Sequence, residues 1–281
     1  MILLADSGST KTRWSLIERE TAVQTCMTKG INPFFQSKGD IVSLLEKEFT
    51  LSKNSVSIIY FYGSGCTPGK SPLVSEALDD YFRPEKIEVN SDLLAAARSL
   101  CQKEEGIACI LGTGSNSCYY DGEKIVQQIP SLGYILGDEG SGAVLGKKLL
   151  GDILKKQLSP VIVEDFHTAY PFLSTAEIIE RVYRQSFPNR FLAQFAPFLL
   201  DHISKPEIKQ LVEDSFTEFI RRNILLYDSS MLPVHFTGSI AYHFRQNLES
   251  VCSLFHLPLG KITKDPLPGL IQYHLKYDPH H

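Results

Sequence analysis

A short segment near the start of the sequence combines a carboxylate with small hydroxyl side chains. An apolar run at residues 2–5 leads into Asp6, and the turn that follows carries Ser9, Thr10 and Lys11. The backbone N–H groups and hydroxyls of such a turn can face phosphate oxygens, and the carboxylate can hold a hydrated Mg²⁺. An ordinary hairpin with a glycine turn has the same pattern. The segment alone therefore leaves both interpretations open.

A second turn of similar chemistry occurs about a hundred residues later. The segment runs from Gly112 through Thr113, Gly114 and Ser115 to Asn116, and it follows the apolar run 107–111. It does not continue as a dinucleotide-binding G-x-G-x-x-G motif, because a serine replaces the third glycine and a strand-like segment follows instead of a helix. We therefore expect a second phosphate-binding turn.

Residues 64–71 come close to the Walker A pattern of nucleotide-binding proteins. The segment lacks only the first glycine, and it follows a predicted strand and precedes a predicted helix. Pro68 and Pro72, however, remove backbone donors where a phosphate cradle needs them. A working Walker A loop is not expected here.

Three further positions carry groups that could act on a ligand. Asp92 stands between a predicted strand and a predicted helix, where a carboxylate can cap the helix and where the helix N-terminus is expected to lower its pKa. Asp138 leads into another predicted helix, where it could equally be a cap. Gly238 and Ser239 join a strand to a helix, which lets the backbone pass close to a ligand or simply makes a turn.

The elements that must position these groups repeat one order of strand, small-residue turn and strand. We predict two α/β domains, residues 1–105 and 106–265, the first completed by a helix at 266–277, with the ligand site in the cleft between them. Strands are expected at 2–29 (three, as an antiparallel meander), 56–62, 86–89, 107–111, 118–120, 124–128 and 234–236. Helices are expected at 40–49, 72–82, 91–102, 139–157 and 241–255, with three or four more before residue 227.

Taken together, these motifs resemble those of the actin–sugar kinase–heat shock protein superfamily. More closely, the sequence resembles the family of N-acetylglucosamine kinases and BadF/BadG-type ATPases. The matching segments occur in the family's order and span nearly the whole chain: 6–12, 90–92, 112–116, 137–141 and 237–239. The resemblance implies two RNase H-like (actin-like ATPase) domains around an interdomain cleft, and ATP-dependent phosphorylation of an amino sugar at its 6-hydroxyl, most simply N-acetylglucosamine.

The resemblance also implies roles for individual residues. Asp92 would be the catalytic base, and Asp6 would hold the Mg²⁺ that accompanies ATP. The residues expected to bind ATP are Ser9, Thr10, Lys11, Gly112, Thr113, Gly114, Gly238 and Ser239. The residues expected to bind the sugar are Asn32, Ser115, Asn116, Gly133 and Asp138.

Two departures from the family pattern leave alternatives open. Arg13 stands where relatives often carry an acidic residue, and residues 130–134 replace a glycine-and-tryptophan stretch that faces the sugar. A kinase of glucosamine or N-acetylmuramic acid, an ATPase that activates a partner enzyme, and a sugar-binding regulator without catalysis are the alternatives.

The composition is that of a water-soluble protein without a nucleic-acid or membrane partner. The 281 residues are 43% apolar and 21% charged, with a net charge of −4. No apolar run approaches the roughly 20 residues of a membrane span, and no signal peptide is expected, so the cytoplasm is the expected location. The six cysteines form no C-x-x-C pair. Four phenylalanines spaced for a helix core or a subunit contact, together with the family resemblance, favour a homodimer: Phe187, Phe191, Phe195 and Phe198.

Overall fold

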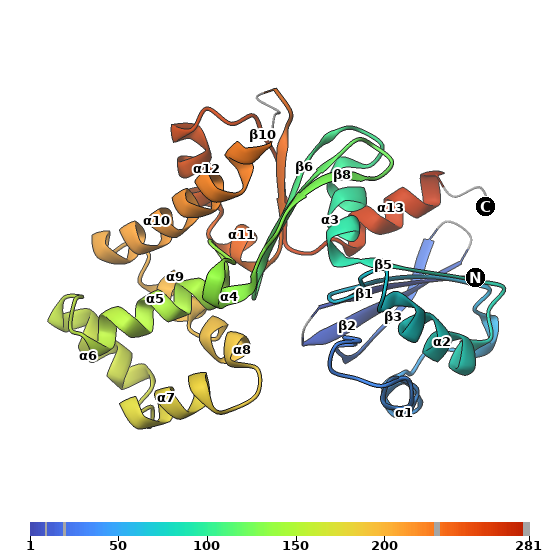
Figure 1. Ribbon diagram of the computed structural model, residues 1–281, viewed down its shortest axis with the longest axis horizontal. Coiled ribbons are helices and arrows are strands. Elements are labelled where there is room, and N and C mark those ends of the chain that lie inside the picture. The colour runs from blue at the N-terminus through green and yellow to red at the C-terminus, as the bar shows by residue number, and fades with distance from the viewer. Residues whose placement is uncertain (9, 19–20, 228–230, 278–281) are drawn as a thin grey trace. The chain divides into compact units, whose positions relative to one another are not determined.

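The computed structural model describes residues 1–8, 10–18, 21–227 and 231–277, and it divides into two compact units (Figure 1). The first unit comprises Met1–Glu104, Gly122–Lys124 and the described residues from Pro266 onward. The second comprises Glu105–Asp121 and Ile125–Asp265. The last helix of the chain, α13 (Leu267–Tyr277), thus belongs to the first unit, where it packs against α3 (Asp92–Cys101).

The first unit is built on a five-stranded sheet in the order β3-β2-β1-β4-β5. The first three strands form the predicted antiparallel meander, and β4 and β5 run parallel to β1. The strands are β1 (Ile2–Ser7), β2 (Lys11–Glu18), β3 (Thr21–Lys29), β4 (Ile58–Gly63) and β5 (Lys86–Ser91).

Both faces of this sheet are covered by helices, which explains the unbroken apolar run at the start of the chain. Leu3 and Ala5 face a core shared with α1 (Lys38–Glu48) and α2 (Ser71–Phe82). Ile2 and Leu4 point to the opposite face, because side chains alternate along a strand, and pack with residues of α3 and α13. The central strand is therefore fixed from both sides, and its end is a rigid place for a site.

The second unit repeats the same topology. Its sheet has the order β10-β9-β6-β7-β8, in which β6, β7 and β8 are antiparallel and β9 and β10 run parallel to β6. The strands are β6 (Gly106–Leu111), β7 (Ser115–Tyr120), β8 (Ile125–Ile129), β9 (Val234–Thr237) and β10 (Leu259–Thr263). The fold class is α/β with two sheets of equivalent strand order, as the sequence predicts.

The helices of the second unit differ from the prediction in several places. The helix predicted at 139–157 begins only at Gly142, five helices replace the predicted three or four, and the helix predicted at 241–255 is two helices. Prolines at the first turns of α6, α8, α9 and α10 start new helices, which explains the extra breaks. Strand β10 and helix α4 were not predicted. The described helices of this unit are α4 (Gly133–Leu136), α5 (Gly142–Leu154), α6 (Pro160–Ala169), α7 (Thr175–Tyr183), α8 (Pro188–Ala193), α9 (Ala196–Asp201), α10 (Pro206–Arg222), α11 (Ser239–His243) and α12 (Arg245–Leu254). A short 3₁₀ turn, η2 (Ile224–Leu226), also belongs to this unit, whereas the 3₁₀ turn η1 (Lys53–Ser55) belongs to the first unit.

The phenylalanine cluster belongs mainly to the core of the second unit. Phe191, Phe195 and Phe198 are buried in that core, whereas Phe187 remains 41% exposed. The interpretation as core packing is therefore confirmed for three of the four rings.

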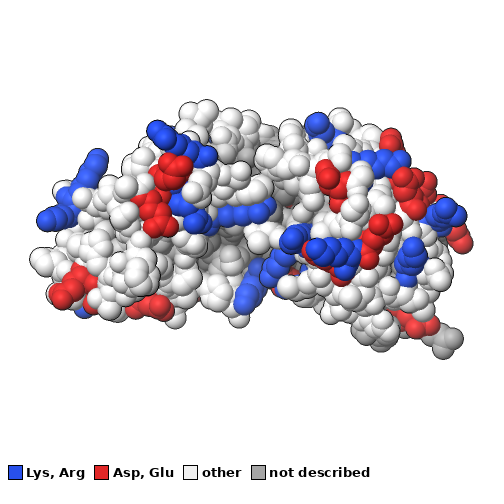
Figure 2. Space-filling view, turned by 90° about the horizontal axis from the view of Figure 1, so that it is seen from below, with Lys and Arg blue, Asp and Glu red and all other residues white. Residues whose placement is uncertain are grey.

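On the face seen in Figure 2, Lys and Arg side chains are interspersed with Asp and Glu side chains over wide uncharged areas. Among the described residues, every helix is too short or too polar to cross a bilayer.

Candidate active site

In the first unit, three parallel strands end side by side and bring the segments after them to one edge of the sheet. Ser7 of β1 is the ladder neighbour of Gly63 of β4, which in turn neighbours Ser91 of β5. The next residues along the chain, Ser64 and Asp92 among them, therefore lie at the carboxyl edge of the sheet. That edge is where ligands bind in open α/β sheets.

Asp92 is the first residue of α3 and is not its cap. The cap is Ser91, whose hydroxyl accepts the backbone N–H of Leu94 at 3.2 Å. The carboxylate of Asp92 accepts hydrogen bonds from the hydroxyl of Ser64 and from the backbone N–H groups of Leu93 and Asp92 itself.

The environment of Asp92 raises its pKa. Burial disfavours the charged form, and this effect outweighs the hydrogen bonds that stabilise it. The expectation that the helix N-terminus would lower the pKa is therefore wrong, because the loss of hydration is the larger effect. A carboxylate with a raised pKa accepts a proton more readily, which suits a general base.

The turn after β1 is held together by small hydroxyl side chains. The Oγ of Ser7 lies 2.7 Å from the Oγ1 of Thr12, and it also accepts the backbone N–H of Ile31 at 3.0 Å. These buried hydroxyls fix the hairpin, while Thr10 and Lys11 at its tip are exposed and free to meet a ligand. Ser9 lies outside the described residues.

Asp6 stands one residue before this turn, with Arg13 and Tyr62 as its ladder neighbours on either side. No cluster of three or more His, Cys, Asp or Glu side chains suited to a metal occurs within the described part of the chain. Mg²⁺ that enters with a nucleotide keeps several waters and needs only one or two protein carboxylates. A single carboxylate such as that of Asp6 fits that requirement.

Asn32 lies close to the Ser64 and Asp92 edge. Its Oδ1 accepts the backbone N–H of Phe34 at 3.0 Å, and its own N–H donates to Oε1 of Gln36 at 2.7 Å. Gly65, with φ +82°, approaches so closely that a Cβ there would lie 2.5 Å from Oδ1 of Asn32. Only glycine permits this contact, which places Asn32 next to the segment that hydrogen-bonds Asp92.

In the second unit, the turn after β6 is anchored to the start of α5. The backbone N–H groups of Gly142 and Ala143 donate to the carbonyls of Gly112 and Thr113 at 2.8 and 3.1 Å. Gly238, with φ +119°, packs so tightly that a Cβ there would overlap the carbonyl oxygen of Leu111. The two glycine turns that the sequence singled out are therefore brought together.

A cavity of about 430 Å³ opens beside these turns. Of the residues predicted to bind ATP, Gly112, Thr113 and Ser239 line this cavity, whereas Gly114 and Gly238 do not. Most of the remaining wall is apolar, with Gln194 and His243 as further polar groups, which suits a flat heterocycle such as a nucleobase. The other lining residues, which were not predicted, are Gly142, Ala193, Ala196, Pro197, Leu200, Ile240 and Phe244.

Asp138 lies in the same unit, beside the first strand residues after the turn. Its φ is +55°, and its carboxylate accepts the backbone N–H of Ser115 and packs over Gly114. The cap of α5 is Ser141, so the capping interpretation of Asp138 is wrong. Burial raises the pKa of Asp138 to about 6, the neighbouring Glu139 adds to the effect, and the bond from Ser115 opposes it.

Three other residues predicted to bind the sugar, Ser115, Asn116 and Gly133, lie outside the turn that follows β6. Ser115 and Asn116 lie in β7, not in the turn. The Oδ1 of Asn116 already accepts from the N–H of Ser117 at 3.0 Å and from Nε2 of Gln128 at 3.2 Å. Gly133 is an exposed residue with φ +72° at the start of α4.

Comparison with solved structures identifies several similar proteins. A protein of Porphyromonas gingivalis described as a proposed N-acetylglucosamine kinase is 48% identical, with a TM-score of 0.96 and 99% of each chain covered. A protein of Chromobacterium violaceum with the same description is 19% identical, with a TM-score of 0.74 over 97% of this chain and 98% of that one.

A more distant match is the glucokinase of Streptomyces griseus of the ROK family, solved with glucose and AMPPNP. It is 13% identical, with a TM-score of 0.53 over 96% of this chain and 97% of that one. The two matches with low identity show the shared fold only. No protein-family profile and no curated protein sequence matches the chain.

Proposed function

The chain belongs to the N-acetylglucosamine kinase family of the actin-like ATPase fold, and from this premise we propose that it transfers the γ-phosphoryl group of ATP to the 6-hydroxyl of N-acetylglucosamine. The observation that carries the proposal is the position of Asp92. Its partly buried carboxylate stands at the carboxyl edge of the first sheet, with a raised pKa and beside the hydroxyl of Ser64.

In the proposed reaction, Asp92 orients the 6-hydroxyl and accepts its proton. The sugar oxygen forms a bond to the γ-phosphorus, the bond from that phosphorus to the β,γ-bridging oxygen breaks, and ADP leaves with the electron pair. Positioning and electrostatic stabilisation supply most of the rate in such transfers. Asn32 and Asp138 would bind sugar hydroxyls, since amide and carboxylate groups can bridge adjacent hydroxyls.

ATP would occupy the cavity of the second unit with its base among the apolar side chains. The turn at Gly112 and Thr113 would meet its phosphates, as would the exposed Thr10 and Lys11 of the first unit. Asp6 would hold the accompanying Mg²⁺ through water. The ion, when bound, neutralises charge on the phosphates.

We propose a homodimer that works in the cytoplasm, where ATP is supplied. The buried phenylalanines do not form its contact, because they fill the core of the second unit. Phe172 and Tyr183 of the same unit are 90% and 76% exposed, and a second copy would cover them. Light scattering on the purified protein would give twice the mass of one chain; the mass of one chain would refute the dimer.

Product analysis tests the proposed reaction. The protein is incubated with ATP, Mg²⁺ and N-acetylglucosamine, and the phosphate is located on the product by ³¹P and ¹³C NMR. The proposal predicts N-acetylglucosamine 6-phosphate in an amount equal to the ADP formed. Phosphate on another hydroxyl, or free phosphate alone, would overturn it.

A further inference from the structure

The loop that follows β3 places two aromatic rings at the surface of the first unit. Phe34 and Phe35 are 57% and 70% exposed and follow Asn32 after one proline, Pro33. Phe34 is not loosely placed, because its backbone N–H is bound by the side chain of Asn32 and its ring carbon Cδ2 lies 3.0 Å from where a Cβ of Gly65 would be. The ring therefore stands beside the Ser64–Gly65 segment, whose serine hydrogen-bonds Asp92.

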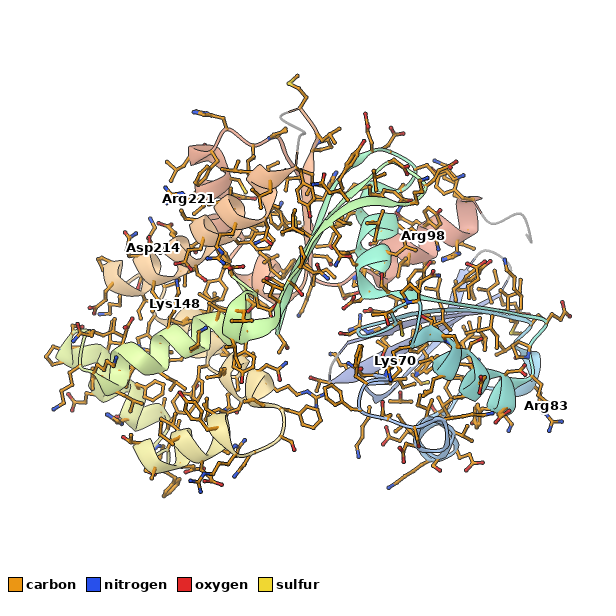
Figure 3. The ribbon with its side chains drawn as sticks, in the orientation of Figure 1. Lys70, Arg83, Arg98, Lys148, Asp214 and Arg221 are labelled. Atoms are coloured by element: carbon orange, nitrogen blue, oxygen red, sulfur yellow. The ribbon has the colours of Figure 1, made fainter. Side chains whose placement is uncertain are left out.

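A lysine ammonium covers this ring. The Nζ of Lys70 lies 5.6 Å from the centroid of Phe34, a cation–π distance. Lys70 immediately precedes α2, as Figure 3 shows. The turn holds its backbone, since its N–H donates to the carbonyl of Thr67 at 2.9 Å.

The charge of Lys70 is not neutralised by an acidic neighbour. Lys38, on α1 of the same unit, pairs with Asp80 at 2.8 Å and approaches Glu76 at 3.8 Å. Lys70 has no such ion pair with any described residue, and its interaction is with the ring. Its field therefore reaches the space beside Phe34.

We propose that Phe34 and Lys70 form a charge-selective wall of the sugar site, which makes the enzyme select hexosamines by the charge of their substituents. This inference rests on the proposed function. The negative charge of Asp92 alone would attract a cationic sugar, and Lys70 offsets that attraction. The wall disfavours a protonated 2-amino group, accepts a neutral acetamido group against the ring, and favours a substituent that bears a carboxylate.

Three probe sugars that differ in charge test this inference. Glucosamine is cationic at about pH 6.5, since its amine titrates like an α-amino group. N-acetylglucosamine is neutral, and N-acetylmuramic acid carries a carboxylate on O-3. Their kcat/KM values are measured with the wild type and with Lys70→Gln, and the Ki against N-acetylglucosamine is used for any sugar that is not turned over.

Lys53→Gln is the matched control. Its Nζ lies 4.5 Å over the ring of Tyr81, so it is also an exposed lysine that contacts an aromatic ring. It stands in η1, before β4, and therefore at the opposite end of that strand from Ser64. Removing that charge should leave the sugar preference as in the wild type.

In Lys70→Gln we expect the kcat/KM for glucosamine, relative to that for N-acetylglucosamine, to rise about three- to tenfold. The kcat/KM for N-acetylmuramic acid, relative to that for N-acetylglucosamine, should fall by about the same factor. In about 0.5 M salt the difference between variant and wild type should shrink, because the charges are screened. The KM for ATP should not change. A merely structural role for Lys70 would not produce a charge-ordered or salt-dependent shift.

The outcomes separate this inference from the proposed function. If the wild type phosphorylates N-acetylglucosamine and Lys70→Gln keeps the same ratios, the wall is refuted and the kinase assignment stands. If the wild type neither phosphorylates nor binds any of the three sugars, both the charge-selective wall and the kinase assignment are refuted.

Discussion

The hydroxyl of Ser64 donates a hydrogen bond to the carboxylate of Asp92 across the edge where β4 and β5 end. Ser64 opens the segment that comes close to the Walker A pattern. Its observed contact is with a carboxylate, and Lys70 of the same segment covers an aromatic ring. The resemblance to a phosphate loop is therefore explained without a phosphate.

Replacing Ser64 with Ala should change the pH dependence of the reaction. The hydrogen bond from Ser64 favours the ionised form of Asp92, so its loss should raise the pKa of that carboxyl further. The base works only when ionised, so the acidic limb of the kcat profile should move to higher pH. A pH–rate profile measures this, with the exposed Ser52→Ala as control; superimposable profiles for Ser64→Ala and wild type would contradict the role.

Replacing Asp92 with Asn should remove the base while keeping the shape of the side chain. Loss of a positioned base costs about 10²–10⁴ in rate, so kcat should fall by that factor. Nucleotide affinity should not change, because Asp92 is not among the residues that line the cavity proposed for ATP. Steady-state kinetics and nucleotide titration check both statements, and a variant with wild-type kcat would show that Asp92 is not the base.

Replacing Asp138 with Asn should weaken sugar binding and stabilise the fold at neutral pH. The native state raises the pKa of Asp138 to about 6, so ionisation above the unfolded value near 3.8 costs stability. That cost is absent below the unfolded pKa, grows between about pH 3.8 and about pH 6, and is fully present above about pH 6. Asn also tolerates a positive φ.

Thermal unfolding from pH 4 to 8 measures this prediction. The Tm of Asp138→Asn should exceed that of the wild type at pH 7, and the difference should vanish near pH 4. The KM for the sugar should rise. A lower Tm than wild type at pH 7, or an unchanged KM, would contradict the assignment.

Replacing Ala193 with Phe should fill part of the cavity of the second unit. Ala193 lines that cavity and is only partly buried, so the ring can extend into the empty space. The KM for ATP should rise about tenfold or more, with little change in the KM for the sugar, since a ring excludes a ligand of similar size. Ala176→Phe on α7, at an exposed position, is the control. An unchanged KM for ATP in Ala193→Phe would show that the nucleobase of ATP does not bind in this cavity.

Much of the fold is predictable from the sequence, because short-range patterns determine it. Alternating or continuous apolar runs identify nine of the ten strands found in the described residues, and both sheets repeat one order. Helix breaks at Pro188 and Pro197 and the short strand β10 were missed. In these places the local pattern is weak and tertiary packing decides.

The chemistry of the site is predictable only in part. Turn composition and the family resemblance pointed to Asp92, Asp138 and the turn at Gly112. The cavity wall at Ala193 and Gln194 carries no sequence signal, since its position depends on how α8 and α9 pack. The raised pKa of Asp92 could not be predicted from the sequence either, because it depends on how far the folded chain buries the carboxyl group.

The rate of ADP release by the wild type, with and without N-acetylglucosamine, distinguishes a sugar kinase from an ATPase that acts on another partner. For a sugar kinase we expect ADP release to depend on the sugar, to saturate with its concentration, and to equal the formation of sugar phosphate. ADP release at the same rate without sugar would contradict the kinase assignment and would indicate instead an ATPase that acts on another partner.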